Sequence, residues 1–339
     1  MKTEAFNYYL PPSLIAQTPI EPRHNSRLLV YQRSSKEISA DIFKNLKAYL
    51  SPGDLLVINK TKVIPARIFG KKVSGGKVEV LLLKKLDDLS WEVLIGGKNV
   101  NKRVEILFEN GLSGVITDVL FRGKRILKFS KQIEPLLKTI GQMPLPPYIH
   151  KKLENQERYQ TIYAENEGSA AAPTAGLHFT NELISELKDY GIIFAKILLH
   201  VGLDTFAPVT ERDIEEHIIH TEWCQIRDLE IDKINKARDE NRRVIAVGTT
   251  SVRTLETSYR YRTPKGSLKP FSGPTDLFIF PGYKFKVVDA MITNFHLPKS
   301  TLLMLVSAFT GLETIKSCYQ YAIQESFRFY SFGDAMFIS

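Results

Sequence analysis

Two continuous apolar runs stand near the start of the chain, at 27–31 and at 54–59, and each predicts a buried β-strand. The second run follows a Ser-Pro-Gly-Asp turn signal. Between the two runs, apolar side chains recur at every fourth position over 41–50, which predicts a helix. A short helix start is expected at 10–16, where a proline falls near the first turn. The first 66 residues therefore mix strands with helices.

The hydrophobic pattern changes after residue 66. Short runs of β-branched and aliphatic residues alternate with turn signals such as Ser-Gly-Gly and Glu-Asn-Gly. Five or six strands at a spacing of 10–15 residues predict a small antiparallel β-barrel. The strand-like runs lie at 78–83, 91–95, 104–108, 114–121 and 125–129.

Helical and strand-like patterns alternate after a proline-rich link at 143–148. A helix is expected over 180–190, with Thr180 as its N-cap, and an apolar strand follows at 192–199. Such alternation is typical of a layered α/β domain. Further strands are predicted at 244–247, 278–280 and 290–292, and further helices at 228–241, directly after 248–251, and at 300–310.

These patterns together predict an α/β protein in which a layered α/β/α domain is interrupted by an inserted small antiparallel β-barrel domain. We expect a discontinuous catalytic α/β domain at 1–66 plus 148–339, and the barrel at 67–147. The length of 339 residues suits two domains of ordinary size. A hydrophobic content of 43% with 24% charged residues excludes a largely disordered chain, a coiled coil and a collagen-like repeat.

The charge balance is basic, with 46 Lys and Arg against 37 Asp and Glu and a formal net charge of +9. Such a balance favours polyanionic partners but does not by itself identify nucleic acid. Between 68 and 131 there are 13 Lys and Arg against 7 Asp and Glu. Most of the excess positive charge therefore lies in the predicted barrel, where we expect a basic surface.

Cysteine content and the start of the chain bear on the compartment. Cys224 and Cys318 are the two cysteines and form no CxxC pair, and the N-terminal residues lack the apolar run of a signal peptide. No stretch of about 18 apolar residues is present, so no membrane segment is expected. We expect a protein of the reducing cytoplasm. It is expected to be a monomer, because no heptad pattern demands a dimer.

The strongest chemical signal is the segment in which a buried strand at 244–247 runs into Gly248-Thr249-Thr250-Ser251 and a helix. The free N–H groups and the dipole of a helix start favour an anion such as a carboxylate or a phosphate. Arg253 could face the same ligand or pair with a surface acid. An ordinary strand-to-helix turn with a hydroxyl N-cap has the same pattern.

A second turn of this kind runs from 293 to 301 and carries Asn294, His296 and Lys299. It should lie at the carboxyl end of a strand, where ligands sit in open α/β sheets. The alternative is a polar loop capped by Ser300.

A third segment, 170–180, combines small residues that permit close backbone approach with His178 just before a helix start. A single histidine is more often structural than catalytic, so both interpretations stay open for His178.

Three further histidines, His200, His217 and His220, are followed by Glu222. His-x-x-His followed by an acid could be a set of metal ligands, but acid–base or polar contacts are favoured because the spacing is generic. Basic residues at 61–67 could touch phosphate, although a solvated linker is the favoured interpretation. No GxGxxG, Walker A or GxSxG motif is present, which argues against a standard nicotinamide dehydrogenase, a P-loop ATPase and an α/β-hydrolase.

Taken together, these motifs resemble those of the S-adenosylmethionine:tRNA ribosyltransferase-isomerase family of queuosine biosynthesis. The resemblance spans almost the whole length and is specific, because several segments are eight or more residues long and unusual in composition. The segments are 14–17, 26–29, 53–59, 143–149, 157–161, 171–180, 248–256, 280–285, 293–304 and 331–334. The chain departs from the usual family pattern at His24 (which follows Arg23), Lys60, Lys62, Leu203 and Asp204.

The resemblance implies a specific reaction. The ribosyl part of S-adenosylmethionine is transferred to the aminomethyl group of 7-aminomethyl-7-deazaguanine at the tRNA wobble position. Adenine and methionine leave, and the ribose becomes the epoxycyclopentanediol of epoxyqueuosine. S-adenosylmethionine is then a ribosyl-donating cosubstrate, and no other cofactor and no metal are implied. The wobble base is expected to be splayed out of the anticodon loop, with the basic barrel as an RNA contact surface.

This chemistry needs a base for the acidified proton at the ribose carbon beside the sulfonium, and a proton for the departing adenine. His178 and His296 are the leading candidates, followed by His200, His217 and His220. Substrate contacts are expected at Arg27, Thr174, Gly176, Gly248, Thr249, Thr250, Ser251, Arg253, Asn294 and Lys299. Two other classes stay open: a non-catalytic RNA-binding protein, and a metal-dependent hydrolase that uses His200, His217 and His220.

Overall fold

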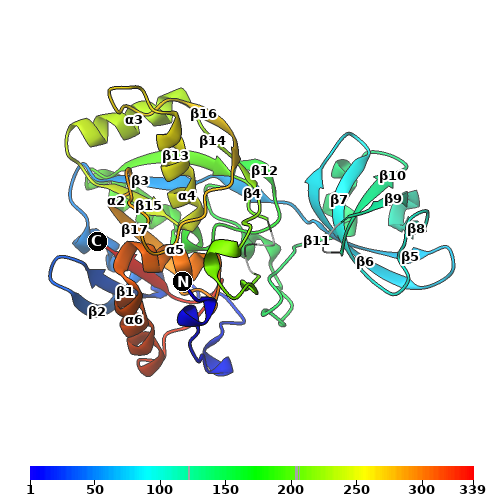
Figure 1. Ribbon diagram of the computed structural model, residues 1–339, viewed down its shortest axis with the longest axis horizontal. Helices are drawn as coiled ribbons and strands as arrows, with labels where there is room; N and C mark the ends of the chain where they lie inside the picture. The colour runs from blue at the N-terminus through cyan, green and yellow to red at the C-terminus, as the bar shows by residue number, and fades with distance from the viewer. Residues whose placement is uncertain (121–122, 203–204, 206) are drawn as a thin grey trace. The chain divides into compact units, whose positions relative to one another are not determined.

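The computed structural model describes residues 1–120, 123–202, 205 and 207–339 (Figure 1). These residues form two compact units. Unit 1 comprises Met1–Lys62, Pro146–Asn166 and Ala172–Ser339, and unit 2 comprises Val63–Leu145 and Glu167–Ala171. Glu167–Ala171 belongs to unit 2 because it is hydrogen-bonded to the start of that unit, where the Ile64 N–H donates to Ser169 O at 3.0 Å. Unit 2 thus differs at both ends from the expected insertion at 67–147.

Unit 1 is built on one large mixed sheet. Its strands are β1 (Arg27–Gln32), β2 (Glu37–Ile42), β3 (Leu55–Asn59), β13 (Ile193–Leu199), β14 (Glu222–Ile226), β15 (Val244–Val247), β16 (Phe271–Thr275), β17 (Ala290–Asn294) and β18 (Ala335–Ile338). Among the described residues their order is β16-β14-β13-β3-β15-β17-β18-β1-β2. The neighbours β13, β3, β15 and β17 run parallel. Every residue of β3, β15 and β17 is buried, as expected for parallel strands covered on both faces.

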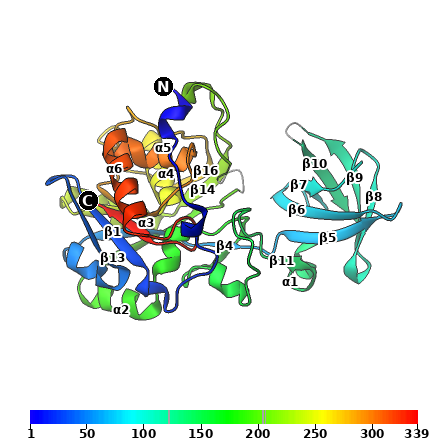
Figure 2. The same ribbon diagram turned by 90° about the horizontal axis from the view of Figure 1, so that it is seen from below.

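Helices cover both faces of this sheet, so the predicted layered α/β/α architecture is confirmed. Figure 2 shows α5 and α6 on the opposite side of the sheet from α2. The α-helices of unit 1 are α2 (Asn181–Asp189), α3 (Asp228–Asp239), α4 (Thr249–Ser258), α5 (Thr301–Thr310) and α6 (Leu312–Gln324). Its 3₁₀ helices are η1 (Thr3–Phe6), η2 (Pro12–Leu14), η3 (Arg23–Asn25), η4 (Phe43–Tyr49), η8 (Gln156–Tyr159), η9 (Thr174–His178), η11 (Ile214–Glu216) and η12 (Tyr259–Tyr261).

Local sequence explains where two of the helices begin. Thr180 caps α2 by accepting from the Leu183 N–H, and Ser300 caps α5 by accepting from the Leu303 N–H. Leu183 and Leu187 of α2 then join Phe43 and Leu56 in one buried cluster against the sheet. Burial of these side chains, rather than helix propensity, holds the layer in place.

Two sequence predictions about elements were wrong, and some strands were not predicted. The stretch 41–50 is not an α-helix, because β2 runs to Ile42 and only the 3₁₀ helix η4 follows. The apolar run at 278–280 is not a strand: Ile279 is buried and its two neighbours are partly buried, but the run pairs with no strand of the described sheets. The strand β16 went unpredicted because it contains Gly273 and Pro274, which an edge strand tolerates.

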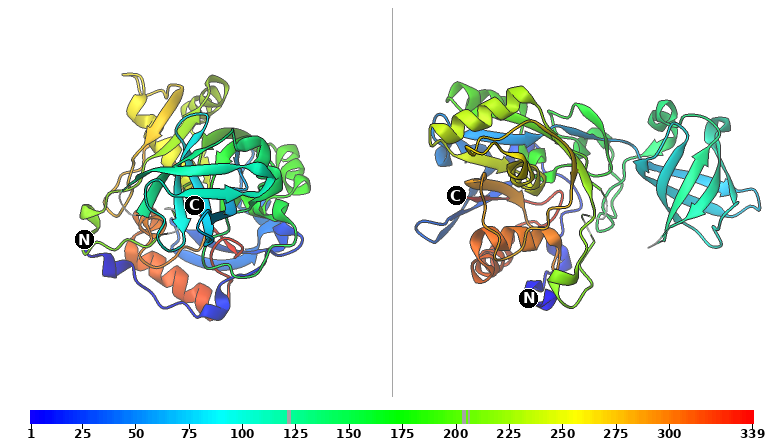
Figure 3. Two further views of the ribbon diagram at one scale, coloured as in Figure 1. Left: turned by 90° about the vertical axis from the view of Figure 1, so that its right-hand side faces the viewer. Right: turned by 45° about the horizontal axis from the view of Figure 1, so that its top comes forward.

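Unit 2 is the predicted antiparallel barrel (Figure 3). Its described strands are β5 (Arg67–Lys72), β6 (Lys77–Lys85), β7 (Ser90–Gly96), β8 (Glu105–Phe108), β9 (Ser113–Val119) and β10 (Lys124–Phe129). The sheet closes because β5 pairs with both β6 and β8. β5 also pairs with β11 (Gly141–Gln142). The unit further contains the short helices η5 (Glu109–Gly111), η7 (Glu134–Leu136) and α1 (Leu137–Ile140). The remaining strands, β4 (Thr61–Val63) and β12 (Asn166–Ser169), form a two-stranded sheet.

Unit 2 has fifteen Lys and Arg against nine Asp and Glu, so it is markedly basic for its size. Within the described ranges, no helix is long and apolar enough to cross a membrane.

Candidate functional site

Four motifs lie at one edge of the large sheet. Parallel strands end at the same edge, and β3, β13, β15 and β17 run there into polar residues. Thr61 follows β3, His200 follows β13, Gly248 follows β15, and Asn294 ends β17. The candidate functional side chains therefore come from strands that are neighbours in space but far apart in sequence. This is the edge at which ligands sit in open α/β sheets.

The turn after β15 is compact and held by its own side chains. Gly248 has φ of 89°, a conformation that favours glycine. The Asn59 amide donates to Thr250 Oγ1 at 3.3 Å, which ties the turn to the end of β3. The Ser251 hydroxyl donates back to Val247 O at 2.8 Å. Thr249, Thr250 and Ser251 are all buried, so protein encloses the start of α4, where the helix dipole favours an anion.

The segment 174–178 packs onto this turn. A Cβ placed on Gly248 would lie 3.8 Å from Ala175 Cβ, so the two backbones approach closely. A Cβ placed on Gly176 would lie 2.1 Å from the hydroxyl oxygen of Tyr163, so only glycine fits at position 176. Thr174 begins this 3₁₀ turn and His178 ends it. The sequence motifs at 171–180 and 248–256 are thus neighbours.

Arg253, on the first turns of α4, forms a buried ion pair with Glu222 of β14. Burial would raise the pKa of Glu222, but Arg253, His220 and the Gly202 N–H together outweigh burial, and the pKa falls to about 2. Glu222 also accepts from the Gly202 N–H at 2.9 Å and the Thr205 hydroxyl at 3.2 Å. Arg253 Nε donates to Leu277 O, and among the described residues its Nη2 has no hydrogen-bond partner. One guanidinium nitrogen therefore stays available to a ligand.

His178 is 5% exposed and lies between a hydroxyl and an amide. Its Nδ1 is 2.7 Å from Ser26 Oγ. Burial lowers the pKa of His178 to about 3, although the neighbouring Asn294 side chain partly offsets this. Within the described part of the chain, His178 Nε2 and Asn294 Oδ1 have no hydrogen-bond partner. The Asn294 amide is oriented because its Nδ2 donates to Tyr330 O at 2.9 Å, and its side chain interacts with His178.

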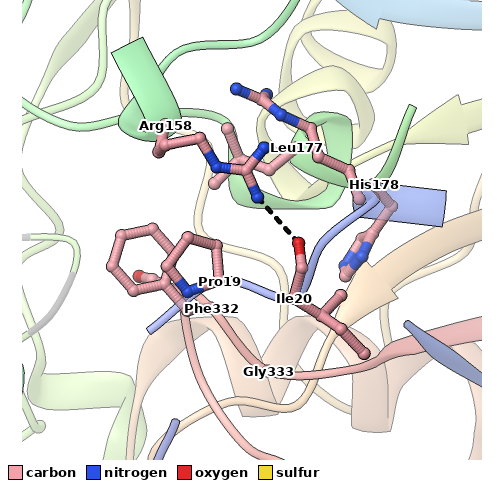
Figure 4. A pocket seen from close by; sticks show the side chains of 9 residues that line it. Pro19, Ile20, Arg158, Leu177, His178, Phe332 and Gly333 are labelled. Atoms are coloured by element: carbon pink, nitrogen blue, oxygen red, sulfur yellow. Dashed lines mark hydrogen bonds between the residues drawn. The ribbon is translucent and has the colours of Figure 1, made fainter. Parts of the chain in front are cut away.

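A pocket opens beside His178 (Figure 4). Its apolar walls include Leu177 and Phe332, and its polar lining includes His178 and two arginines, Arg23 and Arg158. The close-up shows the Arg158 side chain reaching across to Ile20, to whose carbonyl oxygen it donates at 2.7 Å. All of these residues belong to unit 1, and the lining residues are Pro19, Ile20, Arg23, Arg158, Leu177, His178, Ser331, Phe332 and Gly333.

His296 and His200 are both held by a threonine hydroxyl. His296 Nε2 is 2.7 Å from Thr293 Oγ1, and burial lowers the pKa of His296 to about 3. His200 Nδ1 is 2.9 Å from Thr61 Oγ1, its ring stacks on Trp223, and burial lowers its pKa. Both rings are therefore oriented, and His200 remains the more accessible of the two.

The other two histidines pair with acids. His220 Nε2 is 3.4 Å from Glu222 Oε1, so His220 joins the Arg253 ion pair. His217 Nδ1 is 2.9 Å from Glu211 Oε2, and the ring contacts Phe278 edge to face. No group of three or more His, Cys, Asp or Glu residues that could hold a metal ion occurs among the residues described.

Two further expected contact residues point to other partners. Lys299 Nζ forms an ion pair with Glu4 at 2.6 Å. The Arg27 guanidinium lies 3.8 Å above the Phe327 ring and donates to Glu325 O. Neither side chain has a described contact with the motifs at the sheet edge.

Two of the departures from the family pattern have clear contacts. His24 Nδ1 is 2.8 Å from Thr180 Oγ1, at the cap of α2, and Lys60 pairs with Glu165 at 3.3 Å. Leu203 and Asp204 lie outside the described residues.

Sequence reasoning assigned no role to several residues that the structure brings to the site. Arg23 and Ser26 precede β1, and Arg158 lies in η8. The available signal was that 26–29 and 157–161 are among the segments that carried the family resemblance. Their contacts with His178 and its pocket were not evident, because more than a hundred residues separate Ser26 from His178.

Comparison with known proteins gives one consistent result. A family model described as "Queuosine biosynthesis protein" matches residues 3–338. An S-adenosylmethionine:tRNA ribosyltransferase-isomerase from Carboxydothermus hydrogenoformans is 57% identical over 342 residues, covering 100% of both chains. One with the same name from Natranaerobius thermophilus is 54% identical over 345 residues, covering 100% of this chain and 99% of the relative. The crystal structure of S-adenosylmethionine tRNA ribosyltransferase from Thermotoga maritima is similar with a TM-score of 0.58 and 40% identity, covering 99% of this chain and 100% of that one.

Proposed function

The chain belongs to the family of queuosine biosynthesis proteins, and from this premise we propose that it is an S-adenosylmethionine:tRNA ribosyltransferase-isomerase. In the proposed reaction the ribosyl group of S-adenosylmethionine passes to the aminomethyl group of 7-aminomethyl-7-deazaguanine at the wobble position of tRNA. Adenine and methionine are released, and the transferred ribose is rearranged to the epoxycyclopentanediol of epoxyqueuosine. S-adenosylmethionine acts as a cosubstrate, and the reaction needs no other cofactor.

The observation that carries the proposal is the meeting of the motifs at one sheet edge. The turn at 248–251, the turn at 174–178 and Asn294 line a single region with unpartnered polar atoms. A purely structural site would pair such atoms, because a buried polar atom without a partner costs about 1–3 kcal/mol. A non-catalytic RNA-binding scaffold has no need of these atoms, which favours the enzyme.

The start of α4 is the proposed binding place for the methionine carboxylate of S-adenosylmethionine. The turn is buried and its first N–H groups point out of the helix, as a small anion requires. Arg253 Nη2 supplies a further donor nearby, while Glu222 holds the rest of the guanidinium in place. Thr174 and Gly176 are the proposed backbone contacts opposite, where the absence of a Cβ on Gly176 keeps space for Tyr163.

His178 is the proposed group that accepts the acidified proton from the ribose carbon. Ser26 Oγ can accept from Nδ1–H, which leaves the Nε2 lone pair directed to a ligand. Burial keeps the ring neutral at pH 7, as a proton acceptor must be. His296 is the second candidate, although its Nε2 already contacts Thr293. His200 and His220 at the same edge are the proposed sources of the proton that leaves with adenine.

Unit 2 is the proposed surface for the tRNA backbone, because its excess of positive charge suits phosphate contacts. Neutralising four of its lysines should weaken tRNA binding and reduce the salt dependence of the affinity. If the affinity and its salt slope both stay unchanged, the barrel is not the RNA surface. The four are Lys71, Lys72, Lys98 and Lys102.

The decisive experiment supplies tRNA that carries 7-aminomethyl-7-deazaguanine together with S-adenosylmethionine labelled either in the ribose or in the methyl group. We expect the ribose label on the tRNA, with free adenine and with methionine that retains the methyl label. Methyl label on the tRNA without release of adenine would overturn the proposal.

The role of His178 is tested by His178→Ala, with the exposed His150→Ala as the matched control. We expect the His178 variant to lose turnover by at least about tenfold and the control to keep it. A loss of less than about threefold, under 1 kcal/mol of barrier, excludes His178 from catalysis.

We place the enzyme, as a monomer, in the cytoplasm, consistent with two free, buried cysteines.

A further inference from the structure

Two arginines, Arg23 and Arg158, line the pocket beside His178, and the acid that pairs with Arg158 is exposed to solvent. Arg23 donates from Nη1 to Gln160 O at 2.5 Å and from Nη2 to Glu157 O at 3.0 Å. Arg158 donates to Ile20 O at 2.7 Å and forms an ion pair at 2.8 Å with Glu21. Carbonyl groups orient a guanidinium but do not cancel its charge. Glu21 is 73% exposed, so solvent screens most of its effect.

The two positive charges act on each other and on His178. Burial lowers the pKa of Arg23 and Arg158 lowers it further, while Glu21, Glu157 and Tyr163 offset part of this effect. Besides burial, positive charges on Arg328 and Arg23 lower the pKa of His178. Arg328 is not an open cation, because it contacts Asp334 at 3.5 Å. Arg23 and Arg158 are therefore a pair of oriented cations for which an oxyanion is the natural third partner.

The second observation is the polar lining of the same pocket. His178, more than nine-tenths buried, lines it with an Nε2 that has no partner in the described part of the chain. Pro19, Leu177 and Phe332 form apolar walls (Figure 4). The cavity has a volume of only about 20 Å³, so it admits part of a phosphate group and not a whole nucleotide. The oriented arginines suit such a phosphate, and the buried imidazole of His178 lies beside them.

Exposure decides between the two anions that the proposed substrates carry. The turn at 248–251 is buried and suits the carboxylate at the end of a small molecule. Arg158 remains 17% exposed, and an RNA phosphate must stay near the surface because the chain continues on both sides of it. The pocket beside His178 therefore suits the RNA and the turn suits S-adenosylmethionine.

We infer that Arg23 and Arg158 clamp one phosphodiester of the tRNA, the one attached to the nucleotide being modified, and so hold that nucleotide against His178. The inference rests on the proposed function. The clamp has a consequence for the reaction. Burial is the main cause of the lowered pKa of His178, and Arg23 is a smaller one, so a phosphate that offsets the Arg23 charge should raise this pKa slightly when the RNA is bound.

The experiment measures tRNA and S-adenosylmethionine binding separately for Arg158→Gln, with Arg260→Gln as the matched control. Arg260 is an exposed arginine of unit 1 that pairs with Asp276. We expect Arg158→Gln to weaken tRNA binding by about tenfold or more and to reduce the salt slope by about one. S-adenosylmethionine binding should stay within about twofold of the wild type. The control should leave both affinities and the salt slope unchanged.

A modified RNA identifies the contact. Two modified tRNAs are tested, each with an uncharged methylphosphonate in place of one of the two phosphodiesters that flank the target nucleotide. At one of these two positions the methylphosphonate should weaken binding to the wild type. That same position should have little effect on Arg158→Gln, because the clamp is already lost. Arg158→Lys, which keeps the charge, should restore the salt slope but only part of the affinity. Thermal denaturation of each variant confirms folding, and Arg158→Lys serves if Arg158→Gln does not fold.

Three outcomes overturn the inference. Loss of S-adenosylmethionine affinity with unchanged tRNA affinity would assign the pocket to the methionine carboxylate. Unchanged affinity for both would mean that the arginines bind no substrate anion. Equal effects of the methylphosphonate on wild type and variant would place that phosphate elsewhere. Failure of the proposed function is distinguishable, because the wild type would then release no adenine from S-adenosylmethionine, whatever its affinity for tRNA.

Discussion

The buried ion pair between Glu222 and Arg253 allows a quantitative test of how the sheet edge is held. Their side chains are 2% and 6% exposed. Glu222→Gln removes the negative charge and keeps the size, which leaves the Arg253 guanidinium buried without a counter-charge. Breaking a buried pair on one side costs about 3–5 kcal/mol, so we expect the free energy of unfolding of unit 1 to fall by that amount. Arg253→Met should lower the free energy of unfolding less at low pH than at neutral pH, because the unpaired Glu222 can then take a proton.

The sign of the pH dependence follows from the pKa of Glu222, which is lowered from 4.5 to about 2. A carboxyl with a depressed pKa in the folded state stabilises the fold above its unfolded pKa. That stability is lost as the pH falls from about 4.5 toward 2. The wild type should therefore lose stability in this window, and Glu222→Gln should lose correspondingly less.

The assay is urea denaturation followed by tryptophan fluorescence. Trp223 lies beside Glu222, and the other tryptophan, Trp91, belongs to unit 2, so all proteins carry Trp91→Phe to report on unit 1 alone. The double variant Glu222→Gln/Arg253→Met completes a cycle whose coupling energy we expect at about 2–3 kcal/mol. As a control, the exposed pair Arg260 and Asp276 should give less than about 1 kcal/mol. A coupling below about 1 kcal/mol at Glu222 and Arg253 would refute the reasoning.

Three further expectations concern single residues. Folding lowers the pKa of His178 from 6.5 to about 3, so below about pH 6.5 the unfolded chain binds a proton that the folded chain does not, and stability falls with pH. His178→Gln should remove about 1.4 kcal/mol of this loss per pH unit between pH 6 and pH 4. Equal dependence of the unfolding free energy on pH in wild type and variant would contradict this expectation. Gly176→Ala should cost about 1–3 kcal/mol in urea denaturation because its Cβ meets the Tyr163 hydroxyl at 2.1 Å, and a change under about 0.5 kcal/mol would refute the clash. Ser300→Ala should cost about 1 kcal/mol, since the Leu303 N–H loses its cap at 3.2 Å, whereas Ser300→Thr should keep most of it.

The parts of the fold that could be predicted are those in which neighbouring residues decide the outcome. An uninterrupted apolar run at 244–247 can only be a covered strand or helix segment, and the glycine and hydroxyl residues that follow mark its end. The same reasoning located the polar turn at Asn294, and the turn signals between short runs predicted the barrel. Each of these predictions needed no knowledge of distant partners.

The parts that escaped prediction depend on partners far along the chain. Glu222 and Arg253 are 31 positions apart and meet only because β14 and α4 pack together. Arg158 was part of a recognised segment, yet its proximity to Arg23 follows from the way 157–160 folds against 20–23. The edge strand β16 escaped because its glycine and proline are ordinary signs of a loop. Local pattern therefore indicates where polar turns occur, and three-dimensional packing determines which of their side chains meet.

The parallel pairing of β1 with β18 sets an order of events during synthesis. Leu28 pairs with Ala335, so a strand made early waits for one made about 300 residues later. At about 5–20 residues per second that interval lasts roughly 15–60 s on the ribosome. Unit 2, whose strands pair mostly with near neighbours in sequence, can form meanwhile. Until β18 arrives, β17 and β1 expose unpaired edges, and a nascent chain stalled in this interval would be open to capture by a chaperone or by another copy of itself.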